Sequence, residues 1–363
     1  MRVVAAPDSF KGSISAAAAA AALASGWLRV RPGDEMIQLP LADGGEGTLA
    51  VLAAEVRDAR WHEVGVRGPA DAPVQAAWLE MAGNVAVVEL ASAAGLTQLS
   101  ELRPMSAHSY GVGELIADAL NAGASRILIA LGGSACTDGG TGALSALGAR
   151  FLDAGGEVLP LGGGALRRLA RVDLTGLRPP PQFGVSCLTD VRAPLLGPGG
   201  AAAVFGPQKG ASPAEVAALD AGLARLAGLL GGNPAQPGAG AAGGCGYGFA
   251  AAWGAQLRPG AVEVAVIAGL PGALDGADLL ITGEGQYDAS SENGKVVGAA
   301  RAMAAAAPSG AVPVAVVAGR VAVSPPDGVR AVELAALAEG TEAALAEPAR
   351  WLAEAGALLA GAV

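Results

Sequence analysis

Three lysines in glycine-containing segments stand out as candidates for chemistry. The chain has 23 lysines and arginines together, and only Lys11, Lys209 and Lys295 are lysines. Each lies directly beside a glycine, in the segments SFKGS, PQKGAS and ENGKVV. A lysine beside glycine allows a point charge and backbone amides to contact the same anion. We therefore expect at least two of these lysines to bind a phosphate or carboxylate group.

A glycine-rich segment, LGGSACTDGGTG at residues 131–142, follows the apolar run Arg126–Leu131 and precedes an apolar helical pattern. Phosphate-binding loops are built in this order of strand, glycine loop and helix. The segment contains no lysine, and the GxxxxGK[ST] motif of Walker-type ATPases occurs nowhere in the chain. We expect a lysine from another segment to supply the positive charge that this loop lacks.

Acidic residues form the second group of candidates, since they lie in or beside loops and most follow apolar runs. Taken singly, such residues are common as helix caps and turn residues. Taken together, they provide the hard oxygen ligands and the general base that Mg²⁺-dependent phosphoryl transfer requires. The residues are Asp8, Asp43, Glu46, Asp138, Asp190, Glu284 and Asp288.

The composition argues against several other classes of protein. The net charge is −10, and the chain has no basic run, which argues against a nucleic-acid partner. The longest apolar stretch, Val262–Gly283, is interrupted by a proline and two aspartates, which argues against a membrane span. The cysteines are odd in number and widely spaced, which fits a reducing, cytoplasmic location; they are Cys136, Cys187 and Cys245.

The alanine-rich segment SISAAAAAAALASGW resembles a signal peptide superficially. Asp8 stands where a signal peptide has its basic region, and Val3–Ala6 has the pattern of a strand. Alanine is the best helix former, and Ser13 is a candidate N-cap. We therefore expect a strand, a loop and a helix at this end of the chain.

The two ends of the chain predict one α/β domain between them. Residues 1–60 and 265–363 together are expected to form a flavodoxin-like domain, with a parallel five-stranded sheet in the order 2-1-3-4-5. Residues 61–264 are expected to form an inserted, mixed α/β domain, in which the alternating runs of Trp61–Leu90 predict antiparallel strands. Ligands of such parallel sheets bind at the carboxyl ends of the strands, which here carry PDSFKGS and GEGQYD.

Six segments, in order and nearly end to end, resemble the bacterial glycerate kinase family of the type with a flavodoxin-like and a second α/β domain. Gln286 departs from this resemblance because the family usually has arginine after Gly-Glu-Gly, and Thr137 departs because the family often has asparagine or a related residue there. The segments are Ala6–Ala16, Leu39–Thr48, Ala130–Gly148, Leu188–Ser212, Gly238–Gly248, and Ile281–Asp288 with the later Gly294-Lys295.

The resemblance implies an ATP-dependent kinase that phosphorylates D-glycerate to 2-phosphoglycerate with Mg²⁺, in a cleft between the two domains. A 3-phosphoglycerate product or a related small hydroxy acid is the alternative within the same chemistry. A two-lobed protein that binds a hydroxy acid without chemistry is an alternative of another class. An NAD-dependent dehydrogenase would need the GxGxxG match at Gly238–Gly243, which follows a turn instead of a strand. The sequence leaves open whether the chain is a monomer or a homodimer.

Roles for single residues are hypotheses that go beyond the motif match. Lys11 and Lys295, with Ser9, would hold the glycerate carboxylate or the transferring phosphoryl group. The amides of Gly132, Gly133 and Ser134 would bind ATP phosphates, with help from Lys209. Asp43 and Glu46 would bind Mg²⁺ directly or through water, and Asp190 would accept the hydroxyl proton, with Asp288 as second candidate. The other expected binding residues are Asp8, Gly44, Gly45, Asp138, Gly283, Glu284 and Gly285.

Overall fold

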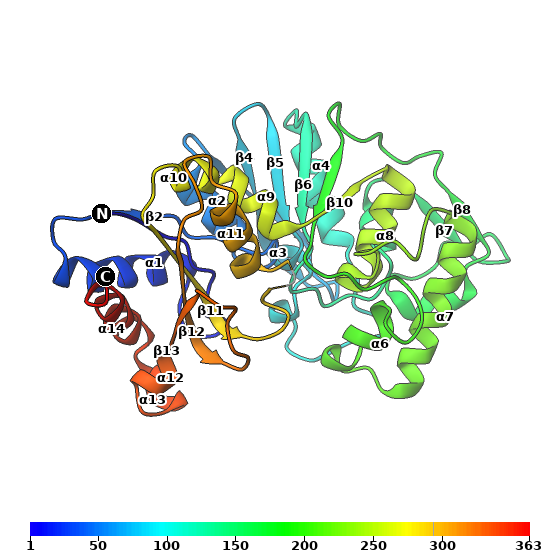
Figure 1. Ribbon diagram of the computed structural model, residues 1–363. Coiled ribbons are helices and arrows are strands. Elements are labelled where there is room, and N and C mark those ends of the chain that lie inside the picture. The colour runs from blue at the N-terminus through cyan, green and yellow to red at the C-terminus, as the bar shows by residue number, and fades with distance from the viewer. Residues whose placement is uncertain (293) are drawn as a thin grey trace. The chain divides into compact units, whose positions relative to one another are not determined.

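The computed structural model describes residues 1–292 and 294–363; Asn293, in the segment ENGKVV, lies outside the described residues. The chain divides into two compact units, drawn as ribbons in Figure 1. The first unit contains Met1–Asp43, Ala50–Val56 and Pro259–Val363, and the second contains Gly44–Leu49 and Arg57–Arg258. Among the described residues, no helix combines the length and the apolar character needed to cross a membrane.

A parallel five-stranded sheet forms the centre of the first unit. Its order is β13-β12-β11-β1-β2, and every neighbouring pair is parallel. Counted along the chain within this unit, the order is 2-1-3-4-5, so the predicted flavodoxin-like sheet formed by both chain ends is confirmed. The strands are β1 (Arg2–Ala5), β2 (Glu35–Gln38), β11 (Leu279–Tyr287), β12 (Val314–Val321) and β13 (Arg330–Glu333).

Helices cover both faces of this sheet, because its strands carry apolar side chains on both sides. One core holds Val3 and Ala5 of β1 against α1 and α14, which lie side by side as the first and last helices in Figure 1. The other core holds Val4 and Leu280 against α9, α10 and α11. The helices are α1 (Ala16–Val30), α9 (Gly260–Ile267), α10 (Leu270–Leu274), α11 (Val296–Ala305), α12 (Leu334–Leu337), α13 (Thr341–Ala346) and α14 (Pro348–Ala360).

Two local predictions in the first unit need correction. The N-cap of α1 is Ser15, whose hydroxyl accepts from the Ala18 amide, while Ser13 donates its hydroxyl to the Phe10 carbonyl. The sequence predicts that the strand ends where the segment GEGQYD begins, but β11 continues through that segment to Tyr287. The reason is pairing: Glu284 lies in register with Ala318, and Gln286 with Arg320, so β12 continues the parallel ladder.

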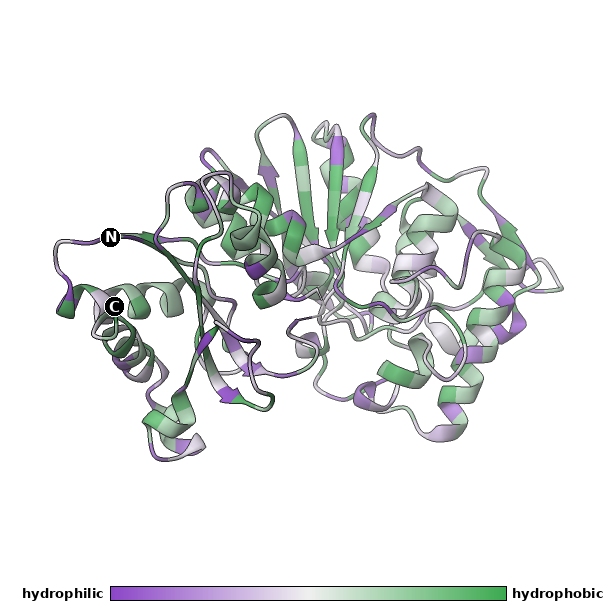
Figure 2. Cartoon of the chain, in the orientation of Figure 1, coloured by the Kyte–Doolittle hydropathy of each residue, from purple (hydrophilic) through white to green (hydrophobic). Residues whose placement is uncertain are grey.

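A mixed six-stranded sheet forms the centre of the second unit and confirms the predicted second α/β domain. Its order is β10-β9-β6-β5-β4-β3, with antiparallel β3, β4 and β5 followed by parallel pairs. The central strands β5 and β6 are mainly hydrophobic in Figure 2, as buried strands require, whereas the edge strands β3 and β10 carry charged residues. The strands of this unit are β3 (Arg60–Arg67), β4 (Pro73–Met81), β5 (Val85–Glu89), β6 (Arg126–Ala130), β9 (Val185–Leu188) and β10 (Gln256–Arg258), with the separate pair β7 (Arg150–Leu152) and β8 (Arg171–Asp173).

Helix α8 (Ala241–Trp253) was not predicted, since its first half is the glycine-rich segment AAGGCGYG. Ala242, Gly243 and Gly244 have left-handed backbone angles, so the helix is kinked at its start. A Cβ on Gly243 would lie 2.1 Å from the Cys136 carbonyl oxygen, so only glycine fits there. The other helices are α2 (Thr48–Glu55), α3 (Leu90–Ala94), α4 (Tyr110–Asn121), α5 (Thr141–Ala146), α6 (Ala201–Phe205) and α7 (Pro213–Leu230), with short 3₁₀ turns at Leu96–Gln98, Gly163–Arg168 and Pro207–Lys209.

Candidate functional site

The carboxyl edge of the first sheet carries a pocket of about 450 Å³. β1 and β11 are neighbours at the point where the strand order reverses, which is where parallel sheets of this kind bind ligands. The chain holds these two strand ends together beyond the ladder, since the Asp8 amide donates to the Gly283 carbonyl. The charged residues that line the pocket are Asp8, Lys11, Asp43, Glu284, Asp288, Lys295 and Arg320.

The two lysines of the pocket each face a carboxylate. Lys11 Nζ lies 3.6 Å from Asp43 Oδ2, and Lys295 Nζ lies 3.9 Å from Glu284 Oε2. Asp43 raises the pKa of Lys11 above its ordinary value, so this ammonium stays charged at neutral pH. The side chain of Lys11 is 77% exposed, so the ammonium is free to turn toward an anion in the pocket.

Two carboxyl groups of the pocket are buried and poorly compensated. Burial, reinforced by the nearby Asp43, raises the pKa of Asp8 to about 7. Burial also raises the pKa of Glu284 above its ordinary value. Glu284 Oε1 is buried and has no hydrogen-bond partner among the described residues. A buried oxygen without a donor is costly, so a cation or a hydroxyl group bound beside Glu284 would be stabilised.

Asp288 is half-buried, and its carboxylate is engaged in the turn that follows β11. Its Oδ1 accepts from the Ser290 amide at 2.8 Å and from the Ser290 hydroxyl at 2.6 Å. These bonds lower the pKa of Asp288, because they favour its charged form. Gln286 directs its side-chain amide to the same carboxylate, at 3.4 Å from Asp288 Oδ2.

The remaining expected residues of this edge are small and shape the backbone. Ser9 lines the pocket, and its amide donates to Asp8 Oδ1 at 2.6 Å. A Cβ on Gly283 would lie 2.0 Å from the Val317 carbonyl oxygen, so β11 and β12 approach too closely there for any other residue. Gly285 also lines the pocket. Gly283 therefore allows the close approach of the two strands, and Gly285 lines the pocket without a side chain.

The carboxyl edge of the second sheet carries the glycine-rich loop that follows β6. The backbone N–H groups of Gly132, Gly133 and Ser134 have no hydrogen-bond acceptor among the described residues. The loop is held from both sides, since Leu96 donates to the Gly133 carbonyl and Ala135 donates to the Ala94 carbonyl. Gly133 has a φ of 72°, a conformation that glycine adopts without strain. Consecutive free amides of this kind form a concave site for an oxyanion.

A second glycine loop, residues 44–47, packs against the first. A Cβ on Gly132 would lie 2.3 Å from the Gly45 Cα, so the two backbones are in direct contact. Gly44 is buried and has a φ of 83°. Glu89, at the end of β5, accepts from the amides of Gly47 at 3.2 Å and Leu49 at 3.3 Å and thereby fixes the second loop. Sequence reasoning missed Glu89, although it ends the strand-like run VAVVE.

Lys209 reaches the glycine-rich loop from the protein interior. Its Nζ donates to Ser134 Oγ at 2.9 Å and to the Cys136 carbonyl at 2.6 Å. The residue is 2% exposed, and burial lowers the pKa of its ammonium. Lys209 therefore contacts the glycine-rich loop directly, and its ammonium group lies on the buried side of that loop.

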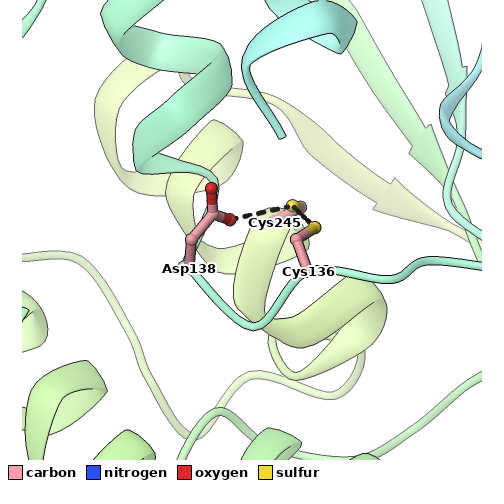
Figure 3. A group of neighbouring side chains, drawn as sticks. All are labelled: Cys136, Asp138 and Cys245. Atoms are coloured by element: carbon pink, nitrogen blue, oxygen red, sulfur yellow. Dashed lines mark hydrogen bonds between the residues drawn. The ribbon is translucent and has the colours of Figure 1, made fainter. Parts of the chain in front are cut away.

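Asp138 belongs to the glycine-rich segment itself, and its side chain is buried in a cluster with Cys136 and Cys245 (Figure 3). Its Oδ2 accepts from the amide and the hydroxyl of Ser109, both at 2.9 Å, and from the Gly142 amide at 3.1 Å. Its Oδ1 accepts from the Gly140 amide at 3.0 Å. The carboxylate is thus fully engaged inside the protein, and it shapes the loop from within.

The two cysteines of this cluster are free thiols, and their Sγ atoms lie 3.9 Å apart. Cys245 Sγ lies 3.9 Å from Asp138 Oδ1, as the dashed line in Figure 3 shows. Because four protein donors already occupy the carboxylate oxygens, we interpret the cluster as packing and not as a metal centre.

Two expected acidic residues belong to the second unit without entering this cluster. Asp190 follows β9 and is half-buried, and β9 is the parallel neighbour of β6. Asp190 therefore lies at the same edge of the second sheet as the glycine-rich loop. Glu46 is exposed, and it lies in the glycine loop that contacts Gly132.

Comparisons with known proteins agree with this arrangement. The glycerate kinase family model matches residues 3–363. The chain is 41% identical over 309 residues to the protein named glycerate 2-kinase of Escherichia coli (strain K12), which covers 82% of this chain and 80% of the relative. It is 42% identical over 306 residues to the protein named glycerate kinase of Bacillus subtilis (strain 168), with 81% and 79% covered.

The chain belongs to the glycerate kinase family. The crystal structure of a candidate glycerate kinase 2 from Salmonella typhimurium LT2 shares the fold, with a TM-score of 0.83 at 37% identity, covering 100% of this chain and 98% of that chain. Membership of this family makes the protein a kinase. A kinase binds a nucleotide and an acceptor, and lysines lie at the carboxyl edge of the first sheet and beside the glycine-rich loop of the second.

The sequence indicated the segments that carry these residues but could not reveal the contacts between them. The structure brings Asp8, Lys11, Asp43, Glu284 and Lys295 together in one pocket. It also brings the two glycine loops into contact. It adds Arg320, which no sequence pattern singled out; the only signal was its place after the apolar run Val314–Ala318.

Proposed function

We propose that this glycerate kinase transfers the γ-phosphoryl group of ATP to the 2-hydroxyl of D-glycerate and forms 2-phosphoglycerate, in the cytoplasm. The carrying observation is the pocket of the first unit, where Lys11 and Lys295 stand among buried carboxyl groups at the edge of a parallel sheet. The name of the Escherichia coli relative, glycerate 2-kinase, supports the 2-phosphate product.

The proposal assigns glycerate to the first unit and the phosphates of ATP to the second. Glycerate is a small anion, and the pocket supplies the ammonium groups of Lys11 and Lys295. The free amides of Gly132, Gly133 and Ser134 suit phosphate oxygens, since such nests bind anions without a side-chain charge. Lys209 holds Ser134 in place and adds a positive charge beneath these amides.

In the proposed reaction, the hydroxyl oxygen of glycerate bonds to the γ-phosphorus while the bond from that phosphorus to the bridging oxygen of ADP breaks. The hydroxyl proton passes to a carboxylate of the protein. Asp190 is the proposed acceptor, and Asp288 is the second candidate. Asp288 is the weaker one, because the hydrogen bonds from Ser290 lower its pKa. The lysines stabilise the charge on the phosphoryl oxygens as the bonds change.

The residues present fit a magnesium ion. Mg²⁺ prefers carboxylate oxygens, and Glu284 Oε1 is a buried carboxylate oxygen without a donor. Asp43 and Glu46 remain the proposed ligands, directly or through water, and Asp8 and Glu284 offer further oxygens in the pocket. When bound, Mg²⁺ would neutralise phosphate charge and orient the γ-phosphoryl group.

The test is turnover of Mg²⁺-ATP with D-glycerate, followed by ³¹P NMR of the product. A 2-phosphoglycerate signal is expected. A 3-phosphoglycerate signal would correct the acceptor hydroxyl, and product from a related hydroxy acid alone would correct the substrate. Lys295→Met keeps the apolar stem but removes the ammonium, so it should lower kcat by roughly 10²–10³-fold. Arg29→Gln, which breaks an exposed pair with Glu354 at the far side of α1, is the matched control and should retain activity.

A further inference from the structure

Arg320 stands in the pocket of the first unit beside Gln286. The two residues are register partners in the parallel pair β11 and β12, so their side chains emerge on the same face of the sheet. Glu284 lies two residues before Gln286 and shares that face. Arg320 is exposed and lines the pocket together with Lys11 and Lys295.

The guanidinium of Arg320 has no hydrogen-bond or ion-pair partner among the described residues. Lys11 and Lys295, in contrast, each face a carboxylate within 4.0 Å. Gln286 directs its amide to Asp288 and leaves Arg320 alone. Every other arginine in the described part of the first unit has a partner: Arg2 with Asp275, Arg29 with Glu354, Arg31 with Asp34, Arg301 with Glu292, Arg330 with Ala362 and Arg350 with Glu347.

We propose that Arg320 binds the carboxylate of the acceptor substrate and makes the kinase select a hydroxy acid over a neutral polyol. The inference rests on the proposed glycerate kinase activity and names the residue that recognises the acid group. A guanidinium presents two parallel N–H donors that match the two oxygens of a carboxylate, whereas a lysine offers a point charge. Lys11 and Lys295 are thereby left for the phosphoryl group.

The positions along the sheet fit a short substrate. Glu284 is in register with Ala318 on the neighbouring strand β12, and Arg320 lies two residues further along that strand. The buried Oε1 of Glu284 lacks a hydrogen-bond donor. With the carboxylate on Arg320, the hydroxyl end of a hydroxy acid points toward Glu284 and Lys295. The hydroxyl group that is not phosphorylated would donate there to the unpaired carboxylate oxygen of Glu284.

The experiment compares Arg320→Gln with Arg330→Gln. Arg330 is exposed and begins the neighbouring strand β13, at the opposite sheet edge, so it serves as the matched control. Dissociation constants for D-glycerate and for glyceramide, its neutral amide, are measured by calorimetry, and KM and kcat are measured with Mg²⁺-ATP. Arg320→Gln should weaken D-glycerate binding and raise its KM by about 10- to 100-fold, the usual effect of losing a charge-assisted hydrogen bond.

In the Arg320→Gln variant, the dissociation constant for glyceramide and the KM for ATP should stay within about twofold of the wild-type values, because neither ligand is bound through a substrate carboxylate. Arg320→Lys should recover part of the lost affinity for D-glycerate, since lysine restores the positive charge without the two parallel N–H donors of a guanidinium. An unchanged KM for D-glycerate, or equal losses for D-glycerate and glyceramide, would overturn the proposal. A raised KM for ATP alone would overturn it too, because Arg320 would then bind phosphate.

The calorimetry keeps the two proposals distinguishable. A wild-type protein that binds D-glycerate but forms no phosphoglycerate would disprove the proposed activity, while a loss of that binding in Arg320→Gln would still support the carboxylate site. A wild-type protein that phosphorylates D-glycerate, with an Arg320→Gln variant of equal KM, would disprove the carboxylate site alone.

Discussion

Lys209 Nζ lies 2.9 Å from Ser134 Oγ, although the two residues are 75 positions apart in the chain. In this contact a buried ammonium donates to the side-chain hydroxyl of Ser134, the residue that carries the last of three consecutive free amides. It explains how a glycine-rich loop without a lysine of its own is provided with positive charge.

Lys209→Met should raise the KM for ATP by about tenfold, because Ser134 loses the donor that holds it and the loop loses its charge. The KM for glycerate should stay unchanged, since Lys209 lies in the other unit. Steady-state kinetics with both substrates varied checks this. Ser134→Ala and the double variant complete a mutant cycle, and a coupling energy near zero would show that the contact does not act on the nucleotide.

Gly132→Ala should destabilise the protein by roughly 1–3 kcal/mol and weaken ATP binding, because the new Cβ would lie 2.3 Å from the Gly45 Cα. Thermal unfolding and nucleotide titration measure both effects. Gly228→Ala is the matched control: it is exposed in α7, a Cβ there meets no atom within 4 Å, and it should stabilise the helix by about 0.5–1 kcal/mol. Equal stability of the two variants would contradict the close contact.

Asp8 should make stability depend on pH between about pH 4 and about pH 7. Its pKa is raised by burial from 3.8 to about 7, so the folded state keeps the proton longer than the unfolded state. Its contribution is therefore greatest below the unfolded pKa and is lost as the pH rises through the folded pKa. From about pH 5 to about pH 8 the loss should reach roughly 3 kcal/mol.

Asp8→Asn should remove this dependence while keeping an acceptor for the Ser9 amide. Urea unfolding of both proteins at the two pH values gives the difference directly. Parallel pH profiles for the wild type and the variant would show that Asp8 titrates as an ordinary carboxyl group.

Asp190→Asn should lower kcat by roughly 10²–10⁴-fold if Asp190 accepts the hydroxyl proton, whereas Asp288→Asn should have a much smaller effect. Asparagine preserves the shape at both positions, so the pair of variants compares the charge alone. Single-turnover rates across a pH series provide the measurement. The reverse ranking would move the base to the first unit, and two fully active variants would exclude both residues.

The alternation of strands and helices at the two chain ends could be predicted from the sequence, because buried parallel strands are continuous apolar runs, as in Leu279–Thr282. The extension of β11 through Glu284 was not readable, because Gly-Glu-Gly is typical of a loop and only pairing with β12 makes it a strand. α8 was missed for a similar reason, since its glycines allow close packing against Cys136 instead of a turn.

The lysines were recognisable as a group because arginine replaces lysine elsewhere in the chain. Their environments were not, since Lys209 in PQKGAS has the pattern of an exposed loop and yet is 2% exposed. Arg320 had no signal beyond its place after an apolar run, because its significance lies in the lack of a partner among the described residues, and partners come from residues distant in sequence.

The pairing of β1 with β11 also sets an order of events during synthesis. The strands of the second sheet lie between Arg60 and Arg258, so that sheet can be completed while β1 still lacks its later partner β11. At about 5–20 residues per second, the ribosome needs roughly 15–55 s to pass from Ala5 to Leu279. The apolar side of α1 stays uncovered for longer still, because its packing partner α14 is formed by residues 348–360. A nascent chain of this kinase should therefore be captured by holding chaperones through its first 30 residues, well after its middle has become resistant to proteases.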